Sequence, residues 1–237
     1  MSLTIVPIDD SDVSVDLFDP AIHPSLAGFL EGPEKSTPYA LVLTNNLPQP
    51  IVGLTVRWIR TDDQGNRPVA TIRSDSFLYS RSPIVPAKGH LLVTPTNFQT
   101  PRPPGTHFIG ATFRARGFND RLDGSSGVTV SFDTIIFEDG HVLGPDESRT
   151  LASLEARKGS GRDIAQRVRQ AMANGENVQA LLRSLSSEPA DNDGPRRLWT
   201  ARFAGTLIHT LTDFAGPTPQ LDQLENLPVL PRFFRKQ

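Results

Sequence analysis

Apolar and polar residues alternate along much of the first 145 residues, which is the pattern of β-strands that bury one face. The clearest run places apolar side chains at every second position: Val52, Leu54, Val56 and Trp58. Turn-forming sequences separate such runs, including residues 62–66 and the pair Asp139 and Gly140. About seven or eight short strands in this arrangement are typical of an antiparallel β-sandwich of the immunoglobulin or fibronectin type. We therefore predict a β-sandwich domain over residues 1–145.

The most apolar strand, at residues 128–137, changes the parity of its buried side chains. Val128, Val130 and Phe132 occupy one parity, whereas Ile135 and Phe137 occupy the other. An extra residue in one strand of a pair produces this change. A β-bulge is therefore expected between Asp133 and Ile136.

The hydrophobic period changes to 3.6 residues after Pro145, which indicates helices. Gly144 and Pro145, followed by two acidic residues, are typical of a helix N-terminus because Pro suits the first helical position and acids suit the first turn. Ser160 and Asp163 form a variant of the capping box, which predicts the start of a second helix.

Two further amphipathic runs, at residues 178–185 and 199–214, complete a predicted helical region of three or four helices. This region spans residues 146–216. Its own core would be small, and small cores stabilise a fold only marginally, so we expect it to pack on or beside the sandwich. The whole chain is predicted to be α+β, with a Pro-rich extended tail at residues 217–237.

The composition of the chain limits its partners. The 237 residues carry a formal net charge of −2, which is too weak a field to indicate nucleic acid or an anionic membrane as a partner. The sequence has no Cys, which excludes disulfides and thiolate chemistry. No apolar run is long enough to span a bilayer, and the first residues lack the features of a signal peptide. A cytoplasmic location is the default expectation.

The densest group of ionisable residues is Glu138, Asp139, His141, Asp146 and Glu147. These side chains could bind a divalent cation or act as an acid and a base. The second interpretation is structural: a hairpin turn, a cross-strand pair and a helix N-terminus account for every residue of the group. The sequence favours the structural interpretation.

The same region carries the one resemblance to known proteins. The stretch VTVSFDTIIFEDGHVLGPDE, at residues 128–147, resembles the last strand pair of uncharacterised bacterial proteins with an immunoglobulin-like sandwich. In those proteins a similar stretch leads into a helix. The resemblance implies the same fold and implies no activity.

No other motif indicates catalysis. The five histidines lack the spacing of a metal site, and neither the GSSG at 124–127 nor the GSG at 159–161 fits a nucleophile or phosphate-binding motif. We therefore predict no catalytic, cofactor-binding or metal-binding residue and no cofactor. The alternative is a metal-dependent or acid/base hydrolase with a site between Glu138 and Glu147.

The tail holds the best candidate for a binding role. Arg232, Phe233 and Phe234 are residue types enriched in the centres of protein interfaces, and neighbouring prolines order the chain before it docks. The tail could instead pack against its own sandwich and cover an edge strand. The leading hypothesis from the sequence is a non-enzymatic protein-binding or scaffold module of unknown partner.

Overall fold

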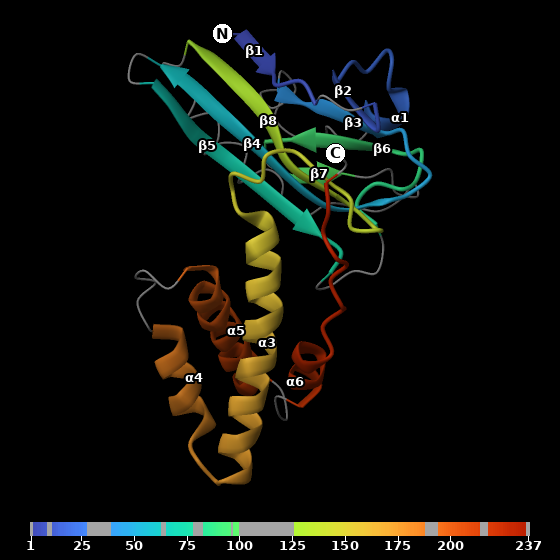
Figure 1. Ribbon diagram of the computed structural model, residues 1–237. Helices are drawn as coiled ribbons and strands as arrows, with labels where there is room; N and C mark the ends of the chain where they lie inside the picture. Colours follow the sequence, from blue (N-terminus) through green and yellow to red (C-terminus); the bar gives the residue numbers. More distant parts are fainter. Residues whose placement is uncertain are drawn as a thin grey trace. The chain divides into compact units, whose positions relative to one another are not determined.

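The computed structural model describes most of the chain (Figure 1), namely residues 2–8, 11–27, 39–62, 65–77, 83–95, 97–99, 126–187, 194–213 and 218–235. The chain divides into two units. The first unit, which we call the sheet unit, consists of Met1–Ser148 and Pro231–Gln237. The second, the helical unit, is Arg149–Leu230. The end of the chain therefore belongs to the sheet unit, although the helical unit precedes it in the sequence.

The described strands of the sheet unit form two β-sheets. The larger sheet has the order β1-β8-β4-β5, with β9 paired to β8, and its strands are β1 (Ser2–Ile5), β8 (Gly127–Phe137), β4 (Ile51–Asp62), β5 (Gly65–Asp75) and β9 (Val142–Leu143). The smaller sheet has the order β2-β3-β6-β7, and its strands are β2 (Val13–Leu17), β3 (Leu41–Asn45), β6 (His90–Thr94) and β7 (Asn97–Gln99). A short helix, α1 (Pro24–Ala27), follows β2.

The two sheets share one hydrophobic core. In β4, the alternating residues Leu54, Val56 and Trp58 are all fully buried. They belong to the same cluster as Leu43 of β3 and Val93 of β6. From Leu54 onward, the period-2 pattern of the sequence therefore identified correctly which side chains of β4 join this core, whereas at the start of the strand Ile51 joins it in place of the predicted Val52.

The prediction that all strands are antiparallel is wrong for one pair. Strand β1 is parallel to β8, with Leu3 opposite Val128, so the larger sheet is mixed. Parallel neighbours need a long connection, which the chain between β1 and β8 supplies. Side chains alternate with period two in either orientation, so the sequence pattern carries no information on this point.

The predicted β-bulge is confirmed. Along the β4–β8 pair, Thr55 lies opposite Thr134, whereas the next residue, Val56, lies opposite Phe132. Asp133 is therefore the additional residue. The bulge turns this side chain out of the regular alternation, and it is fully buried.

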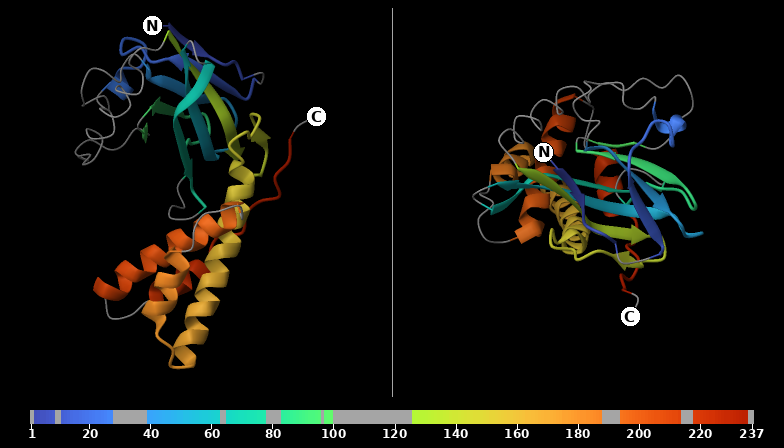
Figure 2. Two further views of the ribbon diagram at one scale, coloured as in Figure 1. Left: turned by 90° about the vertical axis from the view of Figure 1, so that its left-hand side faces the viewer. Right: turned by 90° about the horizontal axis from the view of Figure 1, so that it is seen from above.

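In the described part of the helical unit there are four helices: α3 (Thr150–Ala173), α4 (Val178–Ser187), α5 (Gly194–Asp213) and α6 (Thr218–Glu225). Figure 2 shows α4 and α5, in orange and red-orange, lying along the yellow α3. Each of these helices contributes buried apolar residues to this unit, including Ile164 of α3, Leu182 of α4, Leu207 of α5 and Leu221 of α6. None of the helices in the described ranges is both long and apolar enough to cross a membrane.

Helix α3 differs from the prediction at both expected boundaries. It begins at Thr150 rather than after Pro145, and it continues through Ser160 instead of ending before a second helix. Residues 144–148 precede it without forming a helix. Ser160 is fully buried, and its hydroxyl donates a hydrogen bond to the carbonyl oxygen of Arg196 at 2.7 Å. Tertiary contact with α5 therefore explains this residue, in place of a cap.

The segment predicted as an extended tail contains a helix. Leu221 and Leu224 of α6 are buried, as is Leu227 just beyond its end. Gly161 of α3 lies so near that a Cβ there would be 2.8 Å from Leu227 Cδ1. Apolar residues three apart on α6 therefore gain a partner surface on α3, which stabilises a helix too short to be stable alone.

Charged groups also join α3 to α6. Arg169 donates hydrogen bonds to Glu225, at 2.6 Å, and to Asp222. These two carboxylates raise the pKa of Arg169 above its ordinary value, and the hydrogen bond to Glu225 is the largest cause. Arg169 is charged at every accessible pH, so this shift leaves its charge unchanged, and its two bonds join α6 to α3.

Two glycines of α3 provide a matched test of this packing. At Gly159, a Cβ would lie 3.6 Å from the Arg196 side chain, an ordinary contact, whereas at Gly161 it would overlap Leu227. Ala is favoured over Gly in a helix by about 1 kcal/mol, so we expect G159A to raise the free energy of unfolding by about that amount. We expect G161A to give no gain, because Leu227 must shift. Urea denaturation followed by far-UV circular dichroism measures both, and an equal gain for both variants would contradict the close α3–α6 packing.

Candidate functional site

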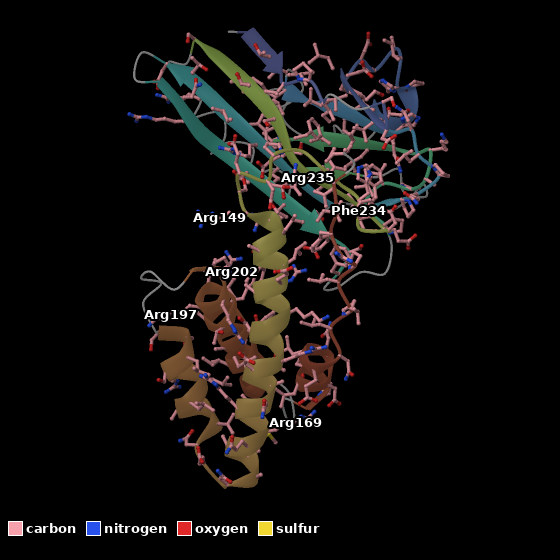
Figure 3. All side chains as sticks on the ribbon, viewed as in Figure 1. Arg149, Arg169, Arg197, Arg202, Phe234 and Arg235 are labelled. Carbon is pink, nitrogen blue, oxygen red and sulfur yellow. The ribbon has the colours of Figure 1, made fainter. Side chains whose placement is uncertain are left out.

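The last described residues of the chain add a strand-like segment to the sheet unit. Phe234 forms a parallel β-bridge with His141, which lies between β8 and β9. The amide of Phe234 donates to the Gly140 carbonyl at 3.0 Å, and the amide of Val142 donates to the Phe234 carbonyl at 2.9 Å. Figure 3 labels Phe234 and its neighbour Arg235 beside the strands of this unit. We call residues 137–144 the docking site and residues 231–235 the C-terminal segment.

A buried histidine forms the floor of the docking site. The ring of His141 is stacked between Phe137, with centroids 5.2 Å apart, and Phe234, with centroids 5.6 Å apart. His141 is only 1% exposed. Asp12 Oδ2 lies 3.9 Å from Nδ1, outside hydrogen-bond range, and within the described residues neither ring nitrogen has a hydrogen-bond partner. The ring therefore serves as a flat aromatic surface on which Phe234 packs.

Gly140 makes room for the C-terminal segment. Its φ of +93° is a conformation that other residues adopt only with strain, and a Cβ at this position would overlap the carbonyl oxygen of Arg232. The Asp139 carboxylate accepts a hydrogen bond from the amide of His141 at 2.9 Å and fixes the turn. The predicted turn at Asp139 and Gly140 thus also shapes the surface that receives the segment.

The three residues predicted to bind a partner lie on this segment in different environments. Phe234 packs on His141 yet remains 45% exposed. Phe233 is half-buried and Arg232 is exposed. The sequence left two alternatives open, and in this structure the segment packs on its own chain. Arg235, which sequence reasoning did not select, donates a hydrogen bond to the carbonyl of Gly144.

The acidic residues Asp139, Asp146 and Glu147 each have a partner of their own. Asp139 is engaged by the turn, while Asp146 accepts a hydrogen bond from the Thr134 hydroxyl at 3.0 Å. Glu147 is exposed and pairs with Arg57. In the ranges that the structure describes, no group of three or more His, Asp or Glu side chains has the arrangement of a metal site.

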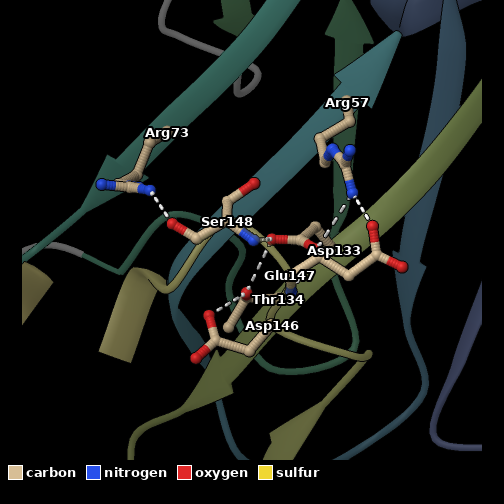
Figure 4. A network of polar contacts seen from close by, with 7 residues as sticks. All are labelled: Arg57, Arg73, Asp133, Thr134, Asp146, Glu147 and Ser148. Carbon is tan, nitrogen blue, oxygen red and sulfur yellow. Dashed lines mark hydrogen bonds and ion pairs between the residues drawn. The ribbon is translucent and has the colours of Figure 1, made fainter. Parts of the chain in front are cut away.

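A buried carboxylate organises the loop after β9 (Figure 4). Asp133, the bulge residue of β8, accepts hydrogen bonds from the amides of Glu147, at 2.9 Å, and Ser148, at 3.1 Å. The guanidinium of Arg57 lies 3.8 Å from the same carboxylate. Arg73 of β5 donates to the carbonyl of Ser148 at 3.0 Å. These contacts hold the loop that joins the sheet unit to α3.

Sequence reasoning did not assign this role to Asp133. The available signal was an acidic residue inside the most apolar strand of the chain, at the position of the predicted bulge. A buried charge must be paired or hydrogen-bonded, so its presence there implied partners from elsewhere in the chain. The sequence pattern could not identify these partners, because residues 147 and 148 were predicted to lie in a helix.

Comparison of the chain with known protein families, curated proteins and solved structures finds no match. The functional conclusion therefore rests on the geometry of the docking site.

Proposed function

We propose that this chain is a non-enzymatic protein-binding module, and that its docking site binds an extended segment by strand addition. The observation that carries the proposal is the β-bridge between His141 and Phe234, with backbone hydrogen bonds on both sides of it. Strand addition is a recurrent mode of peptide recognition, in which the backbone supplies affinity and pockets for alternate side chains supply specificity. Here His141 is the surface that selects an aromatic ring.

The composition of the bound segment supports this proposal. Prolines at 228 and 231 restrict the backbone before it docks, which reduces the entropy lost on binding. Aromatic and arginine side chains are the types that contribute most to interface stability, and the segment carries Phe233, Phe234 and Arg235. Aromatic stacking adds about 0.5–1.5 kcal/mol beyond the burial of area.

The proposed fold of the sheet unit is an immunoglobulin-like sandwich. Two features support it: the sheets have the orders β1-β8-β4-β5 and β2-β3-β6-β7, and they share one core. Domains of this class commonly present loops and sheet edges for binding, although fold analogy alone does not establish function.

Binding of a free peptide tests the proposed function. A labelled peptide of residues 228–237 is titrated with the full-length F234A variant and with the unmodified chain, and fluorescence anisotropy is measured. We expect roughly tenfold or more tighter binding to F234A, because the intact segment of the unmodified chain competes within the molecule at a high effective concentration.

A peptide carrying the same Phe234→Ala change is the matched control and should bind neither protein. Absence of binding of the unmodified peptide to F234A, when circular dichroism shows a folded protein, would refute strand addition at this site.

A further inference from the structure

The docking site has an occupant whose chemistry is known, since it is a segment of this chain. We propose that the C-terminal segment of one chain also occupies the docking site of a second copy, so that the module associates with itself by exchanging this segment. The proposal rests on the proposed function and names the partner that the site binds.

The contacts of the docked segment are local. Phe234 packs on His141 and shares backbone hydrogen bonds with Gly140 and Val142, while Arg235 binds the Gly144 carbonyl. All of these partners lie in residues 140–144. A second copy presents the same atoms in the same arrangement, so the contacts made within one chain can also form between two chains.

The segment is attached to the rest of the molecule at one end through a short exposed connection. Leu227 is buried in the helical unit, next to Gly161 of α3. Beyond it, Pro228 is exposed and Val229 is 80% exposed. From Pro231 onward the chain belongs to the sheet unit. Exchange involves the residues beyond Leu227, and this buried residue keeps its place in the helical unit.

Reciprocal exchange gives a closed dimer. Each chain donates its segment and accepts the other, so the same interface forms twice about a two-fold axis. Docking within one chain has the advantage of a millimolar effective concentration, so we expect the monomer to dominate at low protein concentration. Removing the docking site from one chain releases its segment for a second chain.

Two variants of the 237-residue chain test the docking site and the C-terminal segment separately. In G140A the new Cβ overlaps the Arg232 carbonyl, so the docking site is blocked and the segment is free. In F234A the docking site is intact and the segment lacks its stacking ring. We expect each variant alone to be monomeric and an equimolar mixture to form a 1:1 complex, measured by size-exclusion chromatography with light scattering and by fluorescence anisotropy of labelled F234A.

The outcomes distinguish this inference from the proposed function. If the peptide of residues 228–237 binds F234A but G140A does not, association with a second copy is refuted and strand addition stands. If neither binds, both fail. A double variant, G140A/F234A, is the control and should not bind F234A.

G140A could lose its fold, because position 140 has a positive φ. Circular dichroism checks this, and the unmodified chain then serves as donor. We expect it to bind labelled F234A roughly tenfold more weakly than a free segment would, because its own docking site competes. Absence of any complex at a concentration where the free peptide saturates F234A, after allowing for this competition, would overturn the inference.

Discussion

Replacing Trp58 with Ala is expected to lower the free energy of unfolding of the sheet unit by about 3–5 kcal/mol, the range for a buried aromatic residue. Trp58 is fully buried in the core shared by both sheets. On the central strand β4 it lies opposite Ala70 of β5 and Val130 of β8, so a cavity there removes contacts from three strands. Far-UV circular dichroism during urea denaturation measures the loss.

The conservative variant W58F distinguishes the effect of lost side-chain volume from the effect of the buried indole N–H group. Within the described residues, the indole nitrogen of Trp58 has no hydrogen-bond partner, although it is buried. Phe fills most of the space and removes this uncompensated N–H group, so we expect a loss of only about 1–2 kcal/mol. The other tryptophan, Trp199, lies in the helical unit, and its fluorescence reports on that unit separately in both variants. A loss as large for W58F as for W58A would contradict this account.

Replacing Asp133 with Ala is expected to destabilise the sheet unit by about 3 kcal/mol. The carboxylate accepts hydrogen bonds from two amides, at Glu147 and Ser148, and it lies near the guanidinium of Arg57. Removing it leaves these two partly buried donors without their acceptor, and the cost of such unpaired groups exceeds the value of the original bonds. Hydrogen exchange read by mass spectrometry should show much faster exchange at these two amides.

The backbone of the same loop adds to the expected effect. Asp146 and Arg149 have positive φ values of 57° and 52°, which are unfavourable for residues other than Gly. Asp133 holds the amides between them, so its loss allows the loop to relax into a different conformation. In contrast, Glu147 is 63% exposed, and removing its pairing with Arg57 by E147A should change stability by less than about 1 kcal/mol. Equal effects of D133A and E147A would show that Asp133 does not organise the loop.

Local patterns predicted many of the elements correctly. The period-2 run in β4, the turn at Asp139 and Gly140 and the bulge at Asp133 all appear where the sequence placed them. Each depends on interactions between residues close in the chain or on a single buried face, so the information is present in a short window of sequence. Of the GSSG at 124–127, residues 124 and 125 lie outside the described residues, whereas Ser126 directly precedes β8 and Gly127 begins it.

The wrong expectations concern choices that local sequence leaves open. Residues 145–147 are suited to a helix N-terminus, yet the amide of Asp146 donates to the backbone carbonyl of the distant Asp133, and the amide of Glu147 donates to the Asp133 carboxylate. Ser160 is suited to a cap, yet it joins α3 to α5. In both cases a long-range hydrogen bond engages a group that local capping would have used, and tertiary contacts override local preferences of this size.

By itself, the sequence determined the α+β class, the inward face of the main strands and the residue types of the C-terminal segment, because these follow from the periodicity and composition of short stretches. Only the tertiary structure decided that β1 is parallel to β8, that residues 218–225 are helical and that Phe234 packs on His141. Each of these depends on two segments far apart in the chain that meet in the fold. The hydrophobic pattern of one segment contains no information about the segment that packs on it. The docking site forms only where two such segments meet in the fold.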